Sequence, residues 1–295
     1  EVEDNLLQGS KAVKLTIPKS VKKIGNNSFY QCLKLTTVIL NCIDLEEIGK
    51  SAFSGCASLI EIVLPQKVTI IKEHTFKGCE KLKKIVFPDK LEQILKGAFS
   101  ECTSLTEVKL PQTIKQIGKG AFKKCNKLKH VVIPGVLYIH SNDEVPNEIQ
   151  KSSEIKEFQI PEKCFYKCES LQNIVLLDGC QIIGQRAFSS CTNILGIKMN
   201  VSKGSVLGEG CFQDCNNVMN VEFNVNDQAT LRFESSTFKL CGQLREVIFN
   251  NPDSFESNSV NFGSYVFSQC KNLLHFTFPS KSEVDIGDGC FECCQ

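Results

Sequence analysis

Cysteine is the residue type in this chain that could do the most chemistry, because 17 of the 295 residues are Cys. Thiols pair as disulfides, bind zinc or act as nucleophiles, and each use needs its own spacing. The other candidate ligands or bases are the four histidines His74, His130, His140 and His275. None lies in an H-E-x-x-H motif, and the sequence has no G-x-S-x-G motif and no phosphate-binding glycine loop. The spacing of the cysteines must therefore indicate their role.

Eleven of the cysteines end a Phe-x-x-Cys motif that recurs along nearly the whole chain. The steps between the phenylalanines are 24, 23, 23, 23, 43, 23, 24, 26, 29 and 24 residues. The motifs are Phe29/Cys32, Phe53/Cys56, Phe76/Cys79, Phe99/Cys102, Phe122/Cys125, Phe165/Cys168, Phe188/Cys191, Phe212/Cys215, Phe238/Cys241, Phe267/Cys270 and Phe291/Cys294. A fixed period of this length is the sequence signature of a solenoid, in which each repeat is one coil.

The rest of each unit keeps the same period, with the consensus L-x-x-I-x-L-P-x-x-V-x-x-I-G-x-x-A-F-x-x-C-x-x. The L-x-x-I-x-L segment predicts a strand of a parallel sheet, and the following Pro ends strand pairing. We expect the Gly to permit a tight turn and Phe to fill the interior. The A-F-x-x-C segment is too short for a full helix, so it predicts one helical or 3₁₀ turn.

This consensus resembles the BspA-type, or Treponema-type, leucine-rich repeat over residues 12–294. The resemblance implies a single leucine-rich-repeat solenoid over residues 1–295, with about eleven to twelve coils and a parallel sheet on its concave face. It also implies a surface or secreted binding protein of the adhesin type. It implies no enzyme activity and no cofactor.

The cysteines then have a structural interpretation as small apolar core residues. Eleven occupy one position in each coil, and Cys164, Cys211 and Cys290 replace the Ala of other coils, whereas Cys42, Cys180 and Cys293 fall elsewhere. Stacked equivalents lie about 4.8 Å apart with parallel side chains, which is poor geometry for disulfides. We therefore expect free thiols. A zinc site is disfavoured because the C-x-x-C at the C-terminal end lacks a second ligand pair.

The candidate binding site is the concave face, where the residues that flank the central Ile of L-x-x-I-x-L point away from the core. One column is polar, and the other contains an interrupted apolar stripe. Such an exposed stripe indicates contact with a protein partner, although strand propensity alone explains it as well. The predicted binding residues are Ile39, Val63, Val86, Val132, Val175, Ile248, Glu61, Lys84, Glu107 and His130.

Charge is distributed unevenly, although the formal net charge is only +1. Residues 1–150 carry 22 Lys against 16 acidic residues, and residues 151–295 carry 12 Lys and Arg against 17. The small total disfavours a general nucleic-acid binder. The basic half predicts contact with an acidic partner, a glycan or a membrane surface, with simple drift of solvated charge as the alternative. The short apolar runs predict no transmembrane helix.

Three irregularities interrupt the repeat. The 43-residue step predicts an irregular coil at about 135–161, with a polar loop near 141–153 that could carry specificity or be a tolerated insertion. Residues 224–229 and 250–259 predict loops with a few extra residues. The sequence ends inside a repeat without a polar cap, so we expect a fragment of a longer protein.

Two functions stay open at this point. The first is a non-catalytic module at the cell surface, or secreted, that binds a host or extracellular protein through the concave face. The second is an intracellular scaffold or regulatory binding protein, which the unpaired thiols favour because they suit a reducing compartment.

Overall fold

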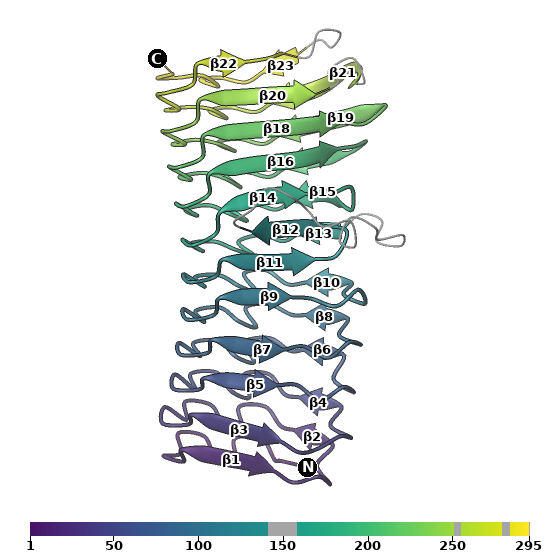
Figure 1. The fold of residues 1–295 in the computed structure, drawn as a ribbon, viewed down its shortest axis with the longest axis vertical. Coiled ribbons are helices and arrows are strands. Elements are labelled where there is room, and N and C mark those ends of the chain that lie inside the picture. Colours follow the sequence, from purple (N-terminus) through teal and green to yellow (C-terminus); the bar gives the residue numbers. More distant parts are fainter. Residues whose placement is uncertain (141–157, 251–254, 279–283, 295) are drawn as a thin grey trace. The chain divides into compact units, whose positions relative to one another are not determined.

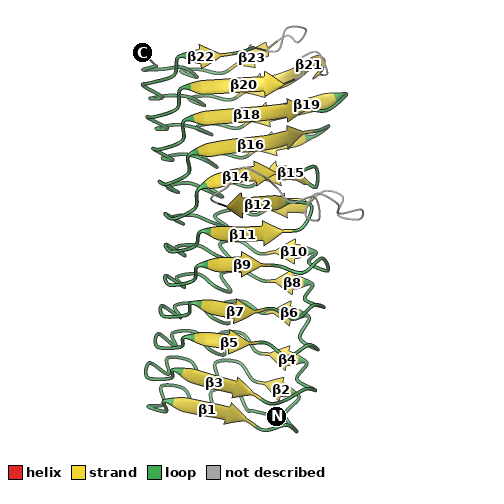
Figure 2. Ribbon diagram, viewed as in Figure 1, coloured by secondary structure: helices red, strands yellow, loops and turns green. Residues whose placement is uncertain are grey.

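The computed structural model describes residues 1–140, 158–250, 255–278 and 284–294. It forms two compact units, residues 1–133 and 134–295. Within each unit, successive coils stack and place their strands side by side (Figure 1). The described residues contain strands and turns but no helix (Figure 2).

Each complete coil of the first unit has a longer strand followed by a two-residue strand. The longer strands are β1 (Lys14–Ile17), β3 (Thr37–Leu40), β5 (Glu61–Val63), β7 (Lys84–Val86), β9 (Glu107–Lys109) and β11 (His130–Ile133). The short strands are β2 (Lys23–Ile24), β4 (Glu47–Ile48), β6 (Ile70–Ile71), β8 (Gln93–Ile94) and β10 (Gln116–Ile117). Neighbouring longer strands pair in parallel, as in β5–β7 and β9–β11. The parallel sheet expected from the sequence is confirmed.

The second unit has longer second strands. Its first sheet runs β12 (Leu137–His140), β14 (Asn173–Leu176), β16 (Gly196–Val201), β18 (Asn220–Val225), β20 (Glu246–Asn250) and β22 (His275–Phe276). Its second sheet runs β13 (Phe158–Ile160), β15 (Cys180–Ile183), β17 (Ser205–Leu207), β19 (Ala229–Phe233), β21 (Phe255–Phe262) and β23 (Val284–Ile286). All pairs are parallel except β12–β14, which is antiparallel.

The coil count is slightly lower than the eleven to twelve predicted. Ten coils in the described residues have a longer strand, a second strand and a Phe-x-x-Cys turn. The irregular segment does not add a regular coil, because β12 enters its sheet in the reverse direction. The polar loop predicted near 141–153 lies outside the described residues.

Of the residues predicted as a loop at 224–229, only 226–228 form a turn, and the other three belong to strands. They extend β18 to Val225 and start β19 at Ala229. The side-chain amides of Asn200, Asn224 and Asn250 bond across the ends of three strands, at 3.1 and 2.9 Å. These bonds satisfy the added polar groups, so lengthening the strands costs little. Of residues 250–259, the described residues 255–259 also belong to a strand, β21.

The predicted helical turn at Phe-x-x-Cys is wrong. In the Phe53 coil, Ser54 and Cys56 donate backbone bonds of 3.0 and 3.1 Å to the third residue before each. The alternate N–H groups instead cross to the next coil, as from Phe53 to Thr75 at 2.9 Å. The residues two before and two after each Phe are left-handed, with φ of 54° at Ser51 and 75° at Gly55. A helix cannot form because it needs consecutive right-handed residues and bonds within its own segment.

Phenylalanine forms the core of both units, as predicted. Within each unit the Phe-x-x-Cys rings stack, with centroids of successive rings 5.1–5.5 Å apart and planes within 2–22° of parallel. Ten of these rings, from Phe29 to Phe267, are at most 1% exposed. Each fully buried Phe contributes about 1.5–3 kcal/mol relative to an exposed one. The stacked Phe rings therefore supply much of the stability of each unit.

The cysteines of the repeat have a hydrogen-bonding role that their spacing did not indicate. The Cys79 thiol donates to the carbonyl oxygen of Phe53 in the preceding coil at 3.2 Å, and Cys102 donates to Phe76 in the same way. Each Phe carbonyl also accepts the N–H of its own coil's Cys, so the thiol occupies its second lone pair. All seventeen cysteines are free thiols, and fifteen are buried.

The glycine before the Phe-x-x-Cys turn allows the backbones of two neighbouring coils to approach closely. It does not provide the tight turn that the sequence predicted. A Cβ on Gly49 would lie 2.4 Å from the carbonyl carbon of Gly25, and one on Gly118 would lie 2.4 Å from the backbone nitrogen of Lys96. Neither glycine has a left-handed φ. Only a residue without Cβ lets the two backbones pack this closely.

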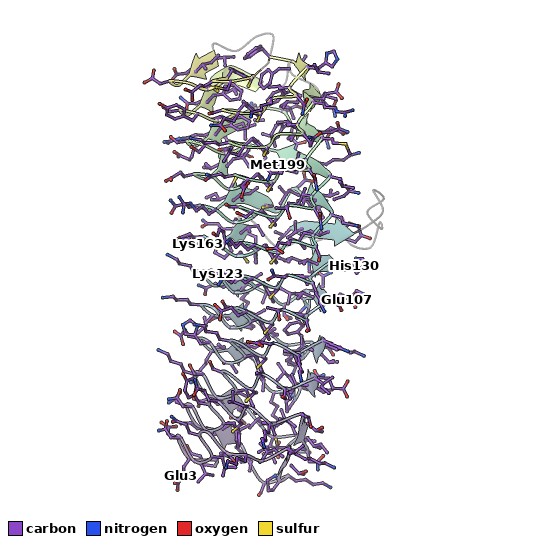
Figure 3. The ribbon with its side chains drawn as sticks, turned by 90° about the vertical axis from the view of Figure 1, so that its left-hand side faces the viewer. Glu3, Glu107, Lys123, His130, Lys163 and Met199 are labelled. Atoms are coloured by element: carbon purple, nitrogen blue, oxygen red, sulfur yellow. The ribbon has the colours of Figure 1, made fainter. Side chains whose placement is uncertain are left out.

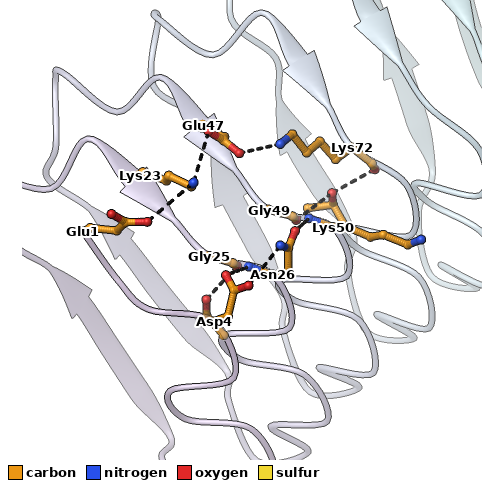
Figure 4. A network of polar contacts seen from close by, with 11 residues as sticks. Glu1, Asp4, Lys23, Gly25, Asn26, Glu47, Gly49, Lys50 and Lys72 are labelled. Atoms are coloured by element: carbon orange, nitrogen blue, oxygen red, sulfur yellow. Dashed lines mark hydrogen bonds and ion pairs between the residues drawn. The ribbon is translucent and has the colours of Figure 1, made fainter.

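Polar contacts hold residues 1–9 to the first complete coil. Val2 pairs with Ile24, and the Asp4 carboxylate accepts the Asn26 N–H at 2.7 Å. Lys23 lies 3.5 Å from Glu1 and 3.8 Å from Glu47, and Glu47 also pairs with Lys72 (Figure 4). These residues act as a partial coil whose backbone continues the inter-coil bonding.

The close approach at Gly49 gives a stability test. We expect Gly49→Ala to lower the free energy of unfolding by about 1–3 kcal/mol, because the new methyl group overpacks against backbone. Urea denaturation measures the change. Gly196→Ala is the matched control, since its Cβ would meet only Asn173 Oδ1 at 3.5 Å. Equal effects of the two substitutions would contradict the close-approach explanation.

Burial of the thiols predicts a simple reactivity pattern. Burial raises the pKa of Cys215 to about 12 and that of Cys290 to about 11, whereas Cys293 is exposed. We expect a thiol reagent at about pH 8 to label Cys293 rapidly and the buried thiols only after unfolding. Cys293→Ser should remove the fastest phase, and the half-buried Cys294 should then be the first thiol to react. Several fast-reacting thiols in that variant would show that the buried cysteines of the repeat are accessible to solvent, which would contradict the prediction.

Candidate binding surface

The outward face of the longer strands is built by strict alternation. In β5, Ile62 is buried while Glu61 and Val63 are exposed, and β7 repeats the pattern around Ile85. Val63 lies opposite Val86 in the ladder. Because successive side chains of a strand point to opposite faces, the buried residues fix which neighbours face outward. We call this outward surface of the first unit, from β3 to β11, the sheet face.

The sheet face carries eight of the ten predicted binding residues. Val63 is 61% exposed and Val86 is 38% exposed, whereas Ile39 and Val132 are half-buried. The polar column beside them is formed by Glu61, Lys84, Glu107 and His130. The structure therefore places these side chains together on one surface, with apolar groups beside charged ones.

Two hollows open in this face where strand pairing is incomplete. β3 and β5 pair only at Thr37 and Glu61, and a hollow of about 520 Å³ lies there. β7 and β9 belong to different sheets, and a second hollow of about 540 Å³ lies between them. Strands that are not held by a full ladder leave space between their side chains. The first hollow is mainly apolar, and Lys83, Lys84 and Lys109 contribute to the second.

Sequence reasoning missed Ile60, which lines the first hollow beside Ile39 and Val63. Its side chain is 45% exposed. The positions equivalent to it in the neighbouring coils hold Thr36 and Lys83. The same column holds exposed apolar residues in other coils as well: Val13, Leu195, Met219 and Leu274. Their recurrence was the signal that could have identified it.

The remaining predicted residues, Val175 and Ile248, do not form a continuous strip. Both are half-buried in the second unit, on β14 and β20. The register places Lys198 and Glu222 between them, and these two residues form an ion pair of 3.5 Å. The apolar stripe is therefore continuous only at Ile39, Val63 and Val86 of the first unit.

The described residues offer little for catalysis or metal binding. No group of three or more His, Cys, Asp or Glu side chains among them could hold a metal ion. On the sheet face, Glu107 is already paired with Lys109 at 2.7 Å. An open surface of this kind favours contact with another macromolecule over enclosure of a substrate. Within the same residues, no helix is long and apolar enough to cross a membrane.

Comparison with known proteins identifies the repeat. The sequence profile described as BspA type leucine rich repeat region matches residues 1–129, 46–157 and 158–295. A leucine-rich repeat protein from Eubacterium ventriosum has a similar structure, with a TM-score of 0.57, 18% identity, and coverage of 96% of this chain and 76% of that one. The pneumococcal vaccine antigen PcpA has a TM-score of 0.53 and 21% identity, with 92% and 67% covered. At these identities the likeness shows the fold. No curated protein matches significantly.

Proposed function

Because the chain belongs to the BspA-type leucine-rich repeat family, we propose that it is a non-catalytic module that binds a protein partner through its sheet face. One observation carries the proposal: Val63, Val86 and Ile60 are exposed beside two hollows, on a scaffold whose other large side chains are mostly buried. Exposed contiguous apolar groups rimmed by polar residues are typical of protein-interaction surfaces.

The mixed character of the sheet face supports a specific partner. Glu61 lies opposite Lys84, and Glu107 forms an ion pair with Lys109, beside the apolar residues. Alternating charges of this kind fix the orientation of a partner more than they add affinity. The binding energy is expected to come from apolar side chains that enter the two hollows.

For location, we propose the cell surface or secretion, as the resemblance implies, which agrees with the description of PcpA as a vaccine antigen. The thiols support the alternative, an intracellular scaffold, because all seventeen are free and Cys293 is exposed. Fractionation of the source cells, with thiol titration of the natural protein, separates the two locations.

The apolar residues of the sheet face give the functional test. A partner is first captured with this chain from extracellular or host protein and purified. We expect Val63→Glu and Val86→Glu each to weaken its binding at least about tenfold, because a charge would have to be buried at the contact. Biosensor titration of the purified partner gives the dissociation constants.

Ile43→Glu is the matched control, since Ile43 is 78% exposed and lines neither hollow. We expect it to leave binding unchanged. All three variants should unfold within about 1 kcal/mol of the parent, because the replaced side chains are exposed. Unchanged affinity in both sheet-face variants would exclude this surface as the contact.

A further inference from the structure

Lysines of the first unit also gather away from the sheet face, at the Phe-x-x-Cys turns. Residues 1–133 contain 22 lysines, no arginine and 13 acidic residues, a net charge of +9. Figure 3 shows Lys123 on one side of this unit and Glu107 and His130 on the opposite side. We call this surface the turn face. Its basic residues in the second to fifth coils are Lys50, His74, Lys77, Lys96, Lys119, Lys123 and Lys124.

Backbone bonds between coils hold these residues in register. The Gly55 N–H donates to the Lys77 carbonyl at 2.7 Å, and the His74 N–H donates to the Lys96 carbonyl at 3.0 Å. Gly97 donates to Lys119 in the same way at 3.0 Å. Since bonded neighbouring chains lie about 5 Å apart, lysines on successive coils stand within reach of one flexible ligand.

His74 lies among three of these lysines. Its left-handed backbone turns the ring over the next coil, where a Cβ on Gly97 would lie 2.5 Å from Nδ1. Nδ1 is buried and has no hydrogen-bond partner. The pKa of His74 is lowered first by this burial and then by the positive charges of Lys77, Lys96 and Lys50. The backbone of His74 also bonds to two of these residues, because its N–H donates to the Lys96 carbonyl and its carbonyl accepts the Lys77 N–H, each at 3.0 Å.

The positive charge at this point is poorly compensated. Among the described residues, the structure records no ion pair for Lys50, Lys77 or Lys96. Glu73 is an acidic neighbour in the same column, and Glu101 pairs with Lys124 at 3.8 Å. Lys72 pairs with Glu47, whereas the Lys50 side chain points away from this network and its backbone N–H donates to the Asn26 side chain (Figure 4).

The second unit does not repeat this arrangement. Its described turns combine acidic and basic residues in similar numbers: Glu162, Glu209, Asp214, Asp288 and Glu292 against Lys163, Lys167, Arg186 and Lys239. The fold alone therefore does not require a basic turn face. The concentration of lysine belongs to the first unit.

We propose that the turn face around Lys50, Lys77 and Lys96 binds an anionic polysaccharide, with sulfate or carboxylate groups meeting the ammonium groups of successive coils. Lysine binds anions as point charges on flexible stems, which suits a polymer without fixed bidentate geometry. The turn face of the second to fifth coils exposes no Phe or Tyr to stack on bases, unlike surfaces that bind single-stranded nucleic acid. It also exposes no large apolar side chain to enter a membrane.

This site is separate from the sheet face, so the polysaccharide proposal and the protein-binding proposal can be tested independently. The test uses the full chain and dextran sulfate as the probe, with neutral dextran as its control. Binding should weaken as salt rises, because each bound ammonium group releases a counterion. We expect the variant K50Q/K77Q/K96Q to bind at least about tenfold more weakly in about 50 mM salt. The slope of the logarithm of the association constant against the logarithm of the salt concentration should be smaller by about 2, because each lost ammonium contact removes about 0.7 from it.

The control variant K34Q/K90Q/K127Q removes three exposed lysines of the same unit outside the turn face. It should stay within about threefold of the parent, as should Val63→Glu. Circular dichroism and thermal melting confirm that each variant is folded. Equal losses in the two triple variants would overturn the proposal, because they would show a general charge effect. Absence of dextran sulfate binding, or tighter binding to phosphatidylserine vesicles or oligo-dT, would overturn it as well.

Discussion

The spacing between stacked coils constrains everything else in this protein. Successive Phe rings lie 5.1–5.5 Å apart, and backbone N–H groups of one coil reach carbonyls of the next at 2.7–3.0 Å in the Phe53 coil. Each position of the repeat must tolerate a copy of itself at that distance. Flat rings can stack there, thiols can reach the carbonyl below, and glycine lets backbones touch. The residue types of the core, including the fourteen cysteines at repeat positions, follow from this one requirement.

Residues that face the core were predictable, because the same requirement acts on every coil and repeats the same residue types. The turn geometry was not. Short Phe-x-x-Cys segments suit a helical turn locally, yet left-handed residues such as His74 and Arg186 occur in them without glycine. A left-handed residue costs about 1–2 kcal/mol, and the inter-coil backbone bonds offset that cost. Those bonds join segments more than 20 residues apart, so no local pattern reveals them.

The candidate binding residues were predictable only as columns. Alternation along each strand determines that Val63 and Val86 face outward, and the structure places them there. Continuity of the surface depends on how neighbouring strands pair, which the repeat consensus does not contain. The single pair between β3 and β5 opens the hollow that Ile60 lines. In the second unit, the Lys198–Glu222 ion pair separates Val175 from Ile248. Local departures from the repeat therefore determine the surface.

Solvent-facing columns are where a solenoid can vary without disturbing its core, because each coil contacts only its neighbours. Lysines on the turn face cost little packing energy, but they do repel one another, and their positive charge adds to the effect of burial in lowering the pKa of His74. A bound polyanion relieves the repulsion, and it stabilises the folded state by the free energy with which it binds. Dissolved salt relieves it only partly, by screening. The charge of the first unit is therefore a cost to the isolated fold that a matching ligand recovers.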